Sequence, residues 1–201
     1  MWIEFFGPPG VGKSTTRRAL ATLRSMATPA PLPGWRATMP ESWDPFYEHA
    51  EAAFQRAMRR NREAAEPRWW SFQRHMARVV GAHRRPELVL LDDGLAQRGQ
   101  SLAAADGLPA DILRYYELMP RPQLLVVLTA DADTILRRNR KRALEHGAHY
   151  DLSDERYRAL DVVALALPIL QRRGFNVLHL SALKPAEENA RAIADALREA
   201  A

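Results

Sequence analysis

Cysteine is absent from all 201 positions of the sequence. Its absence excludes disulfide bonds, thiolate metal sites and cysteine nucleophiles, although it says little about the cellular compartment. Long hydrophobic runs are also missing. No apolar stretch approaches the ~20 residues that span a bilayer, and the start of the chain has no signal-peptide pattern. A cytoplasmic protein without a membrane partner is therefore expected.

Lysine is scarce. Only Lys13, Lys141 and Lys184 occur, so arginine carries almost all of the net charge of +5. Guanidinium groups suit two-point contacts with phosphates and carboxylates. The arginines are nevertheless spread along the chain and interleaved with glutamate, which is typical of solvated helix faces. Binding to nucleic acid is therefore the weaker interpretation of the positive charge.

What the sequence does contain is a P-loop. The stretch GPPGVGKS at positions 7–14 matches the pattern G-x-x-x-x-G-K-[ST]. An apolar run of strand length precedes it at 1–6, and a segment without Pro or Gly at 14–26 predicts a helix after it. A strand, a glycine-rich turn and a helix are the setting in which this motif binds a nucleoside triphosphate. The residues expected to hold the triphosphate are Gly7, Pro8, Pro9, Gly10, Val11, Gly12, Lys13, Ser14 and Thr15.

The chemistry of the motif assigns a role to each part of it. Glycines remove side chains where the backbone must wrap a polyphosphate, and successive N–H groups at the helix start face the phosphate oxygens. Lys13 would bridge the β and γ phosphates, and the Ser14 hydroxyl would complete the oxygen shell of a Mg²⁺ ion. The sequence has no Asn-Lys-x-Asp guanine motif, so ATP is favoured over GTP.

A second signal is the run Leu88-Val89-Leu90-Leu91, which is followed by Asp92 and Asp93. Four consecutive apolar residues predict a strand that is buried on both faces, as in a parallel sheet. In a P-loop fold the carboxyl end of this strand faces the phosphates, so a carboxylate there is expected to serve Mg²⁺. Asp92 is the first candidate for this metal-side carboxylate, and Asp93 is the alternative.

Strand-like and helical segments alternate along the whole chain, which predicts one α/β domain over residues 1–201. We expect a three-layer α/β/α P-loop NTPase fold, with a parallel sheet of about five strands and a helical lid. A break is expected at Glu66-Pro67, between two amphipathic helices that occupy 45–82. The expected strands lie at 1–6, 35–39, 87–91, 123–129 and 175–180.

With these pieces in order, the chain resembles P-loop kinases of the nucleoside and nucleotide kinase superfamily, above all thymidylate kinases and deoxynucleoside kinases. The resemblance covers nearly the full length, although only the P-loop is specific by itself. It implies that Glu41 lies near the phosphoryl acceptor, with 45–82 as the helical acceptor-side segment. It also implies that 137–151 is a lid that folds over the phosphates. Arg138 and Arg142 share a helix face there and are the preferred lid cations.

The chain departs from these kinases at the end of the third strand. The relatives have Asp-Arg or Glu-Arg there, and that arginine contacts the acceptor. Here the pair is Asp92-Asp93, with Arg98 a helical turn later. Arg98 either takes over the contact with the acceptor or is a surface helix residue. Because the family arginine is missing, a sugar, polyol or natural product joins nucleosides among the candidate acceptors.

The sequence therefore predicts an ATP-dependent kinase that moves the γ-phosphoryl group to a small-molecule hydroxyl or phosphate. The alternatives are a nucleic-acid 5′-end kinase and an NTP-hydrolysing switch or assembly ATPase. The expected partners are ATP, Mg²⁺ and the acceptor, and a homodimer is compatible with the resemblance. The candidate catalytic residues are Lys13, Asp92, Asp93, Glu41, Arg138 and Arg142, the metal ligands are Ser14 and Asp92, and the acceptor contacts are Glu41 and Arg98. Asp92, Asp93 and Glu41 remain alternatives for the base that accepts the proton of a hydroxyl.

Overall fold

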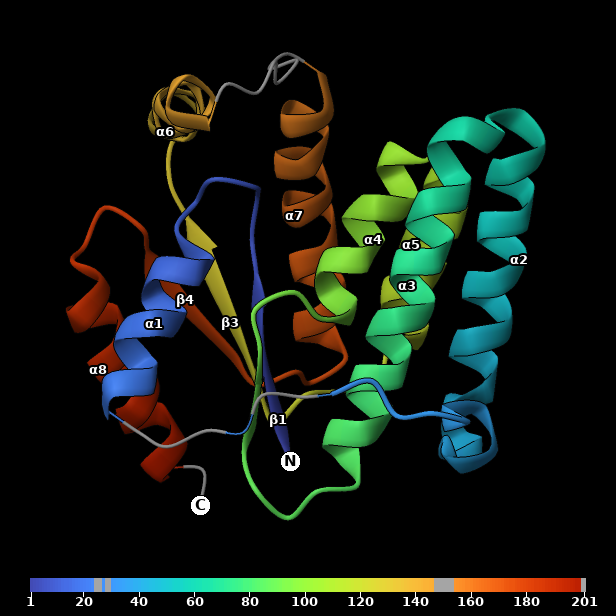
Figure 1. Cartoon of the computed structure of the whole chain (residues 1–201), viewed down its shortest axis with the longest axis horizontal. Helices are drawn as coiled ribbons and strands as arrows, with labels where there is room; N and C mark the ends of the chain where they lie inside the picture. Colours follow the sequence, from blue (N-terminus) through green and yellow to red (C-terminus); the bar gives the residue numbers. More distant parts are fainter. Residues whose placement is uncertain (24–26, 28–29, 147–153, 200–201) are drawn as a thin grey trace.

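A computed structural model describes residues 1–23, 27, 30–146 and 154–199 of the chain. It has a parallel β-sheet with helices on both faces, as the sequence predicts (Figure 1). The elements in chain order are β1 (Trp2–Phe6), α1 (Lys13–Leu23), η1 (Trp35–Thr38), η2 (Glu41–Trp43), α2 (Asp44–Arg60), α3 (Arg62–His83), β2 (Val89–Leu91), α4 (Leu95–Ala104), α5 (Pro109–Leu118), β3 (Leu124–Thr129), α6 (Ala132–His146), α7 (Asp154–Arg172), β4 (Val177–Ser181) and α8 (Ala186–Glu199).

The sheet of the described residues has four strands in the order β2-β1-β3-β4, not about five. The segment expected as an edge strand at 35–39 is the short 3₁₀ helix η1 instead. Its local i→i+3 bonds follow Gly34, whose φ of 63° turns the chain into the left-handed region that glycine tolerates. Beside β2, the place of a fifth strand is marked by a single parallel bridge between Ala27 and Val89.

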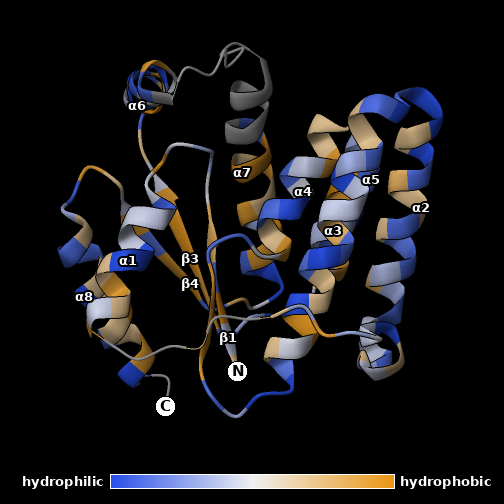
Figure 2. Cartoon of the chain, in the orientation of Figure 1, coloured by the Kyte–Doolittle hydropathy of each residue, from blue (hydrophilic) through white to orange (hydrophobic). Residues whose placement is uncertain are grey.

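Alternation along β1 divides the hydrophobic core in two. Ile3 and Phe5 are buried on the face that α1 and α8 cover. Trp2 and Phe6 are buried on the other face, where α3, α4, α5 and α7 pack and α2 lies outside α3 and α5 (Figure 1). In Figure 2, β3 and β4 have the apolar colour, whereas the helices carry both apolar and polar colours. Full burial of each large apolar side chain contributes about 1.5–3 kcal/mol to stability.

The break expected at Glu66-Pro67 is wrong, because Pro67 lies inside α3. The boundary between α2 and α3 falls at Asn61, whose side chain accepts a hydrogen bond of 3.1 Å from the Ala64 amide. A proline costs a helix one hydrogen bond. Buried side chains of α3 such as Phe72 and Met76 outweigh that cost here. None of the helices in the described part of the chain has the length and apolar character needed to cross a membrane.

Candidate active site

A cleft of about 1020 Å³ opens where the carboxyl ends of the parallel strands meet the helices that follow them. In open α/β sheets this edge is where ligands bind. Four segments of the chain line the cleft. They are the P-loop with the start of α1, the acidic loop 92–94 with the start of α4, the middle of α6, and the region between β4 and α8. Seven of the nine predicted triphosphate residues, from Pro9 to Thr15, therefore share one cleft with the acidic pair, whereas Gly7 and Pro8 are not among the residues that line it.

Glycine is required in the P-loop by close packing as well as by conformation. Gly7, Gly10 and Gly12 have φ values of 151°, 83° and 111°, which side chains rarely adopt. A Cβ atom on Gly10 would lie 2.2 Å from the Asn139 side chain of α6. The loop is thus shaped by helix α6 from 130 positions away as well as by its own sequence.

Lys13 begins α1 and folds back over the P-loop. Its Nζ atom donates hydrogen bonds to the carbonyl oxygens of Gly7 at 2.7 Å and Pro8 at 3.1 Å. Burial of the ammonium group lowers the pKa of Lys13 to about 8, although Asp93 and Asp92 oppose this shift and Arg98 adds to it. The lysine lies close enough to the acidic loop to be affected by both carboxylates.

Helix α6 contacts the P-loop through two neighbouring side chains. Arg138 donates from Nη1 to the carbonyl of Val11 at 3.0 Å and from Nη2 to the carbonyl of Ala182 at 2.8 Å. Asn139 is buried and donates from Nδ2 to the carbonyl of Pro9 at 3.2 Å. The side chain of Arg142 and residues 147–151 of the expected lid lie outside the described residues.

The two carboxylates of the acidic loop have different partners. Asp92 forms an ion pair of 3.4 Å with Arg17 of α1, and both side chains are more than one-third exposed. Asp93 forms ion pairs with Arg98 of α4 and, at 3.3 Å, with His75 of α3. Burial alone would raise the pKa of Asp93. The hydrogen bond from His75 and the charge of Arg98 outweigh burial and lower the pKa to about 2. Asp93 is therefore held in its ionised form between Arg98 and His75.

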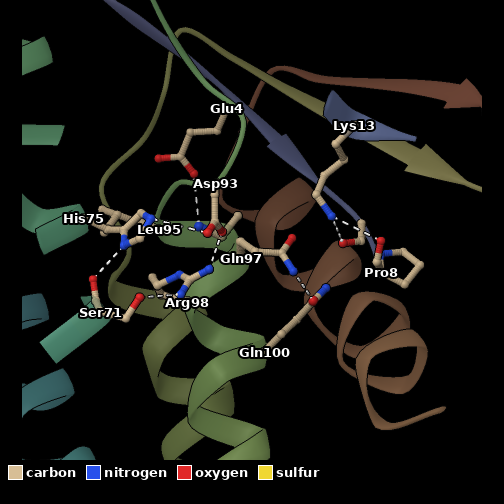
Figure 3. A network of polar contacts seen from close by, with 12 residues as sticks. Glu4, Pro8, Lys13, Ser71, His75, Asp93, Leu95, Gln97, Arg98 and Gln100 are labelled. Atoms are coloured by element: carbon tan, nitrogen blue, oxygen red, sulfur yellow. Dashed lines mark hydrogen bonds and ion pairs between the residues drawn. The ribbon is translucent and has the colours of Figure 1, made fainter. Parts of the chain in front are cut away.

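Arg98 is not a surface helix residue. Its side chain is 11% exposed and donates to the Ser71 hydroxyl at 2.9 Å as well as to Asp93. His75 lies on the other side of Asp93 and binds the Ser71 carbonyl through Nδ1 at 2.6 Å (Figure 3). Since a carbonyl oxygen only accepts, Nδ1 carries the proton in that bond. Ser71, His75, Asp93 and Arg98 thus form one network that joins α3 to α4.

The predicted position of Glu41 needs correction, because this residue lies away from the cleft. It begins the 3₁₀ helix η2, is exposed, and is not among the residues that line the cleft. The neighbouring Trp43 packs against Trp2 at a ring distance of 5.6 Å and against His83 at 4.9 Å. Trp2 is the first residue of β1, whereas the P-loop follows its last residue. This packing holds Glu41 at the opposite end of the strand.

The oxygen ligands predicted for Mg²⁺ do share the cleft. Ser14 is exposed at the start of α1, and Asp92 lines the same cavity. One hydroxyl and one carboxylate fit a metal that keeps several waters and takes its other ligands from phosphates. In the described residues no group of three or more His, Asp or Glu side chains forms a ready-made metal cage.

The sequence analysis missed Asn139, which lines the cleft, and two partners of the acidic pair, Arg17 and His75. Arg17 lies one turn after Lys13 in α1, so its spacing was a usable signal for a second cation near the acidic pair. Asn139 lies inside the basic run at 137–142, and the prediction considered only the arginines of that run. His75 gave no signal, because its contact with Asp93 depends on how α3 packs against α4.

Comparison with known proteins shows a shared fold. Deoxyadenosine kinase from M. mycoides with bound dATP is similar with a TM-score of 0.61 and 14% identity, over 98% of this chain and 100% of that chain. The same kinase with the products dCMP and a flexible dCDP gives 0.61 and 14%, over 99% and 100%. With bound dCTP it gives 0.57 and 12%, over 99% and 100%. No family model and no curated protein matches the sequence. The chain therefore has the α/β P-loop fold seen in a deoxynucleoside kinase, while the thymidylate-kinase subtype finds no support.

Proposed function

We propose that this protein is an ATP-dependent phosphotransferase that moves the γ-phosphoryl group of ATP to a small-molecule acceptor. The observation that carries the proposal is the meeting of a complete P-loop and an acidic pair in one cleft, with Lys13 close enough to be affected by Asp92 and Asp93. Phosphoryl transfer needs mainly positioning and neutralisation of charge, and these residue types supply both. The shared fold with a deoxynucleoside kinase supports the same class of reaction.

The reaction uses the two sides of the cleft differently. On the nucleotide side, the P-loop amides, Lys13 and Arg138 would bind the phosphates, and Ser14 and Asp92 would hold Mg²⁺, which would supply positive charge against the phosphates. The acceptor oxygen bonds to the γ-phosphorus while the bond to the β–γ bridging oxygen breaks. ADP leaves, and the acceptor proton passes to a carboxylate. The low pKa of Asp93 makes that carboxylate a weak base, so it is better suited to hold cationic groups than to accept the proton.

The balance of charge favours a hydroxyl over a phosphate as the acceptor. Around the acidic loop each carboxylate is already paired with an arginine, Asp92 with Arg17 and Asp93 with Arg98. The other cations that line the cleft lie on α1, on α6 and between β4 and α8. Among the described residues that line the cleft, no further cation apart from the P-loop lysine lies next to the acidic loop, so a phosphate acceptor would bring negative charge there without a new cationic partner. The segment 45–82, which supplies Ser71 and His75 to this network, is the proposed acceptor side.

A release assay for ADP tests the proposal over four sets of acceptors: nucleosides, their monophosphates, sugars and polyols, and short oligonucleotides with a 5′-hydroxyl. The proposal expects ADP release that depends on a neutral small molecule. Release only with oligonucleotides, with affinity that falls steeply with salt, would assign the protein to nucleic-acid end chemistry instead. Release that no acceptor changes would assign it to the hydrolysing switches.

A further inference from the structure

Glu4 is a buried ionisable side chain in the middle of the sheet. It lies on β1, an interior strand, and is 0% exposed. Strand alternation points it to the same face as Trp2 and Phe6, which belong to the larger apolar cluster. An ionisable group in such surroundings costs free energy unless hydrogen bonds compensate for the lost water. The partners of Glu4 therefore indicate what it does.

Both carboxylate oxygens of Glu4 accept hydrogen bonds. The Trp2 indole donates to Oε1 at 3.0 Å, and the backbone amide of Ala96 donates to Oε2 at 3.0 Å. Burial raises the pKa of Glu4, and the amides of Ala96 and Leu95 together with the Trp2 indole oppose that shift. Figure 3 shows Glu4 over the first turn of α4, between Lys13 on one side and His75 on the other.

The contact with Ala96 replaces a missing helix cap. Helix α4 begins at Leu95, and its N-cap residue Gly94 has no side chain to bind the free amides of the first turn. A Ser, Asp or Asn at the N-cap normally accepts one of these bonds. Glu4 does so from 92 positions away, with its carboxyl group at the positive end of the helix. Gly94 is glycine because a Cβ atom there would lie 2.3 Å from Cδ of Glu4.

The cap lies at the point where the pairing of β1 with β2 ends and the acidic loop begins. Parallel pairing between β1 and β2 ends at the pair Glu4–Leu91, and Asp92 and Asp93 follow without strand pairing. Beyond this pair, the hydrogen bond from the Ala96 amide to Glu4 links β1 directly to the start of α4, the helix that follows the acidic pair. The P-loop follows β1 after Phe6, so the same strand supports both sides of the cleft.

We propose that Glu4 is a positioning residue, which holds Asp92 and Asp93 opposite the P-loop by capping helix α4 from inside the sheet. This role rests on the proposed phosphotransferase function, but the contact itself is independent of it. Glu4 does not line the cleft. Its effect on the reaction passes through Gly94 and the first turn of α4.

Glu4→Gln is the sharpest variant, because it keeps size and shape but replaces one accepting oxygen by an amide nitrogen. Either Ala96 or Trp2 then faces a group that cannot accept its proton. We expect backbone hydrogen exchange at residues 95–96 to rise about fivefold, as for a lost N-cap. The kcat should fall about tenfold through misplacement of the acidic pair, while the Kd for a fluorescent ATP analogue with Mg²⁺ stays within about twofold.

The matched control is Ile3→Val, a buried substitution in the same strand that points to the opposite face. It should change stability without changing exchange at 95–96 or the ratio of kcat to ATP affinity. A folded Glu4→Gln protein with unchanged exchange and kcat would overturn the proposal. An ATP Kd that weakens in step with kcat would also overturn it, because the effect would then be on the P-loop or on the whole fold.

A second test works from the other side of the contact, and its first variant keeps Glu4, so it remains available if Glu4→Gln does not fold. Gly94→Ala should push the Glu4 carboxylate aside and increase exchange at 95–96. In a Glu4→Ala background that clash is gone, so Gly94→Ala should add little. Purely additive effects would contradict the proposal. These readouts need no acceptor, so failure to find phosphotransferase activity would not be confused with failure of the cap.

Discussion

The two walls of the cleft are built in different ways. The P-loop wall is made from backbone, with left-handed glycines, the amides at the start of α1, and carbonyl oxygens that Lys13, Arg138 and Asn139 bind. The acidic wall is made from side chains, in which Asp92 and Asp93 are held by arginines, a histidine and the capped start of α4. The first wall follows from a local motif, whereas the second depends on packing among β1, α3 and α4.

This difference between the two walls predicts that the loss of Lys13 reduces turnover more than any other substitution proposed below. Lys13→Ala should reduce turnover about 100-fold or more, because it withdraws a charge from the β and γ phosphates. Stability should change little, since Lys13 contacts only carbonyl oxygens of its own loop among the hydrogen bonds described. Steady-state kinetics and thermal unfolding measure the two effects. Arg114→Ala, which removes an exposed ion pair with Glu117, is the control.

Full turnover in a well-folded Lys13→Ala protein would rule out the triphosphate assignment. It would also remove the contrast between the two walls, since the backbone wall would then carry no essential charge.

The acidic pair should give the next largest defects, and these should differ between the two residues. Asp92→Asn should lower kcat about 10- to 100-fold and raise the Mg²⁺ concentration needed for half-maximal rate, because a metal-side carboxylate is lost. Asp93→Asn should act mainly on the KM of the acceptor by releasing Arg98 and His75. It should also cost about 1 kcal/mol of stability, a value kept small because Asp93 is partly exposed to solvent.

Kinetics over a range of Mg²⁺ concentrations separate the two variants. The same Mg²⁺ dependence and the same ratio of kcat to KM in both would contradict the division of roles between Asp92 and Asp93.

The contrast also explains what the sequence could predict. The P-loop, the strand before the acidic pair and the alternation of strands and helices are local patterns, so they identified the fold and one wall of the cleft. The burial of Arg98, the role of His75 and the distance of Glu41 from the site arise from contacts between distant elements. Glu41 was placed by resemblance alone, and the packing of Trp43 at the other end of β1 overrides that placement.

The predictions of a strand at 35–39 and of a helix break at Glu66-Pro67 failed for related reasons. A left-handed Gly34 redirected a segment with strand-like residues into η1. Pro67 stays helical because the buried face of α3 outweighs one lost hydrogen bond. In both places a local preference competes with the rest of the fold, and sequence patterns alone do not show which one wins.

Asn139 tests whether the P-loop wall also depends on packing. Asn139→Ala removes the hydrogen bond to Pro9 and the side chain that fills the space beside Gly10. We expect the KM for ATP to rise about three- to tenfold with a smaller change in kcat, because the loop loses support but keeps its charges. Titration with a fluorescent ATP analogue gives an independent value. An unchanged ATP affinity would mean that the loop holds its shape without α6.

The smallest expected effect is the uptake of a proton when ATP binds. A pKa of about 8 leaves much of Lys13 neutral in the free protein above that pH. Phosphate charges favour the protonated amine, so ATP binding should take up a proton, and affinity should fall as the pH rises through 8. Calorimetry at pH 8.5 in two buffers of different ionisation enthalpy should give about three-quarters of a proton. Lys13→Arg, which does not titrate there, should give none. Equal uptake by both proteins would assign the proton to another group.

The central claim is that the cleft transfers the γ-phosphoryl group to an acceptor and does not merely hydrolyse ATP. The most direct measurement follows the label of γ-³²P-ATP in the wild-type protein with a panel of neutral hydroxyl compounds and their phosphorylated counterparts. We predict that the label appears in a neutral acceptor, that the phosphorylated counterpart accepts little, and that Lys13→Ala abolishes transfer. Label found only in inorganic phosphate, at a rate that no acceptor changes, would contradict the account.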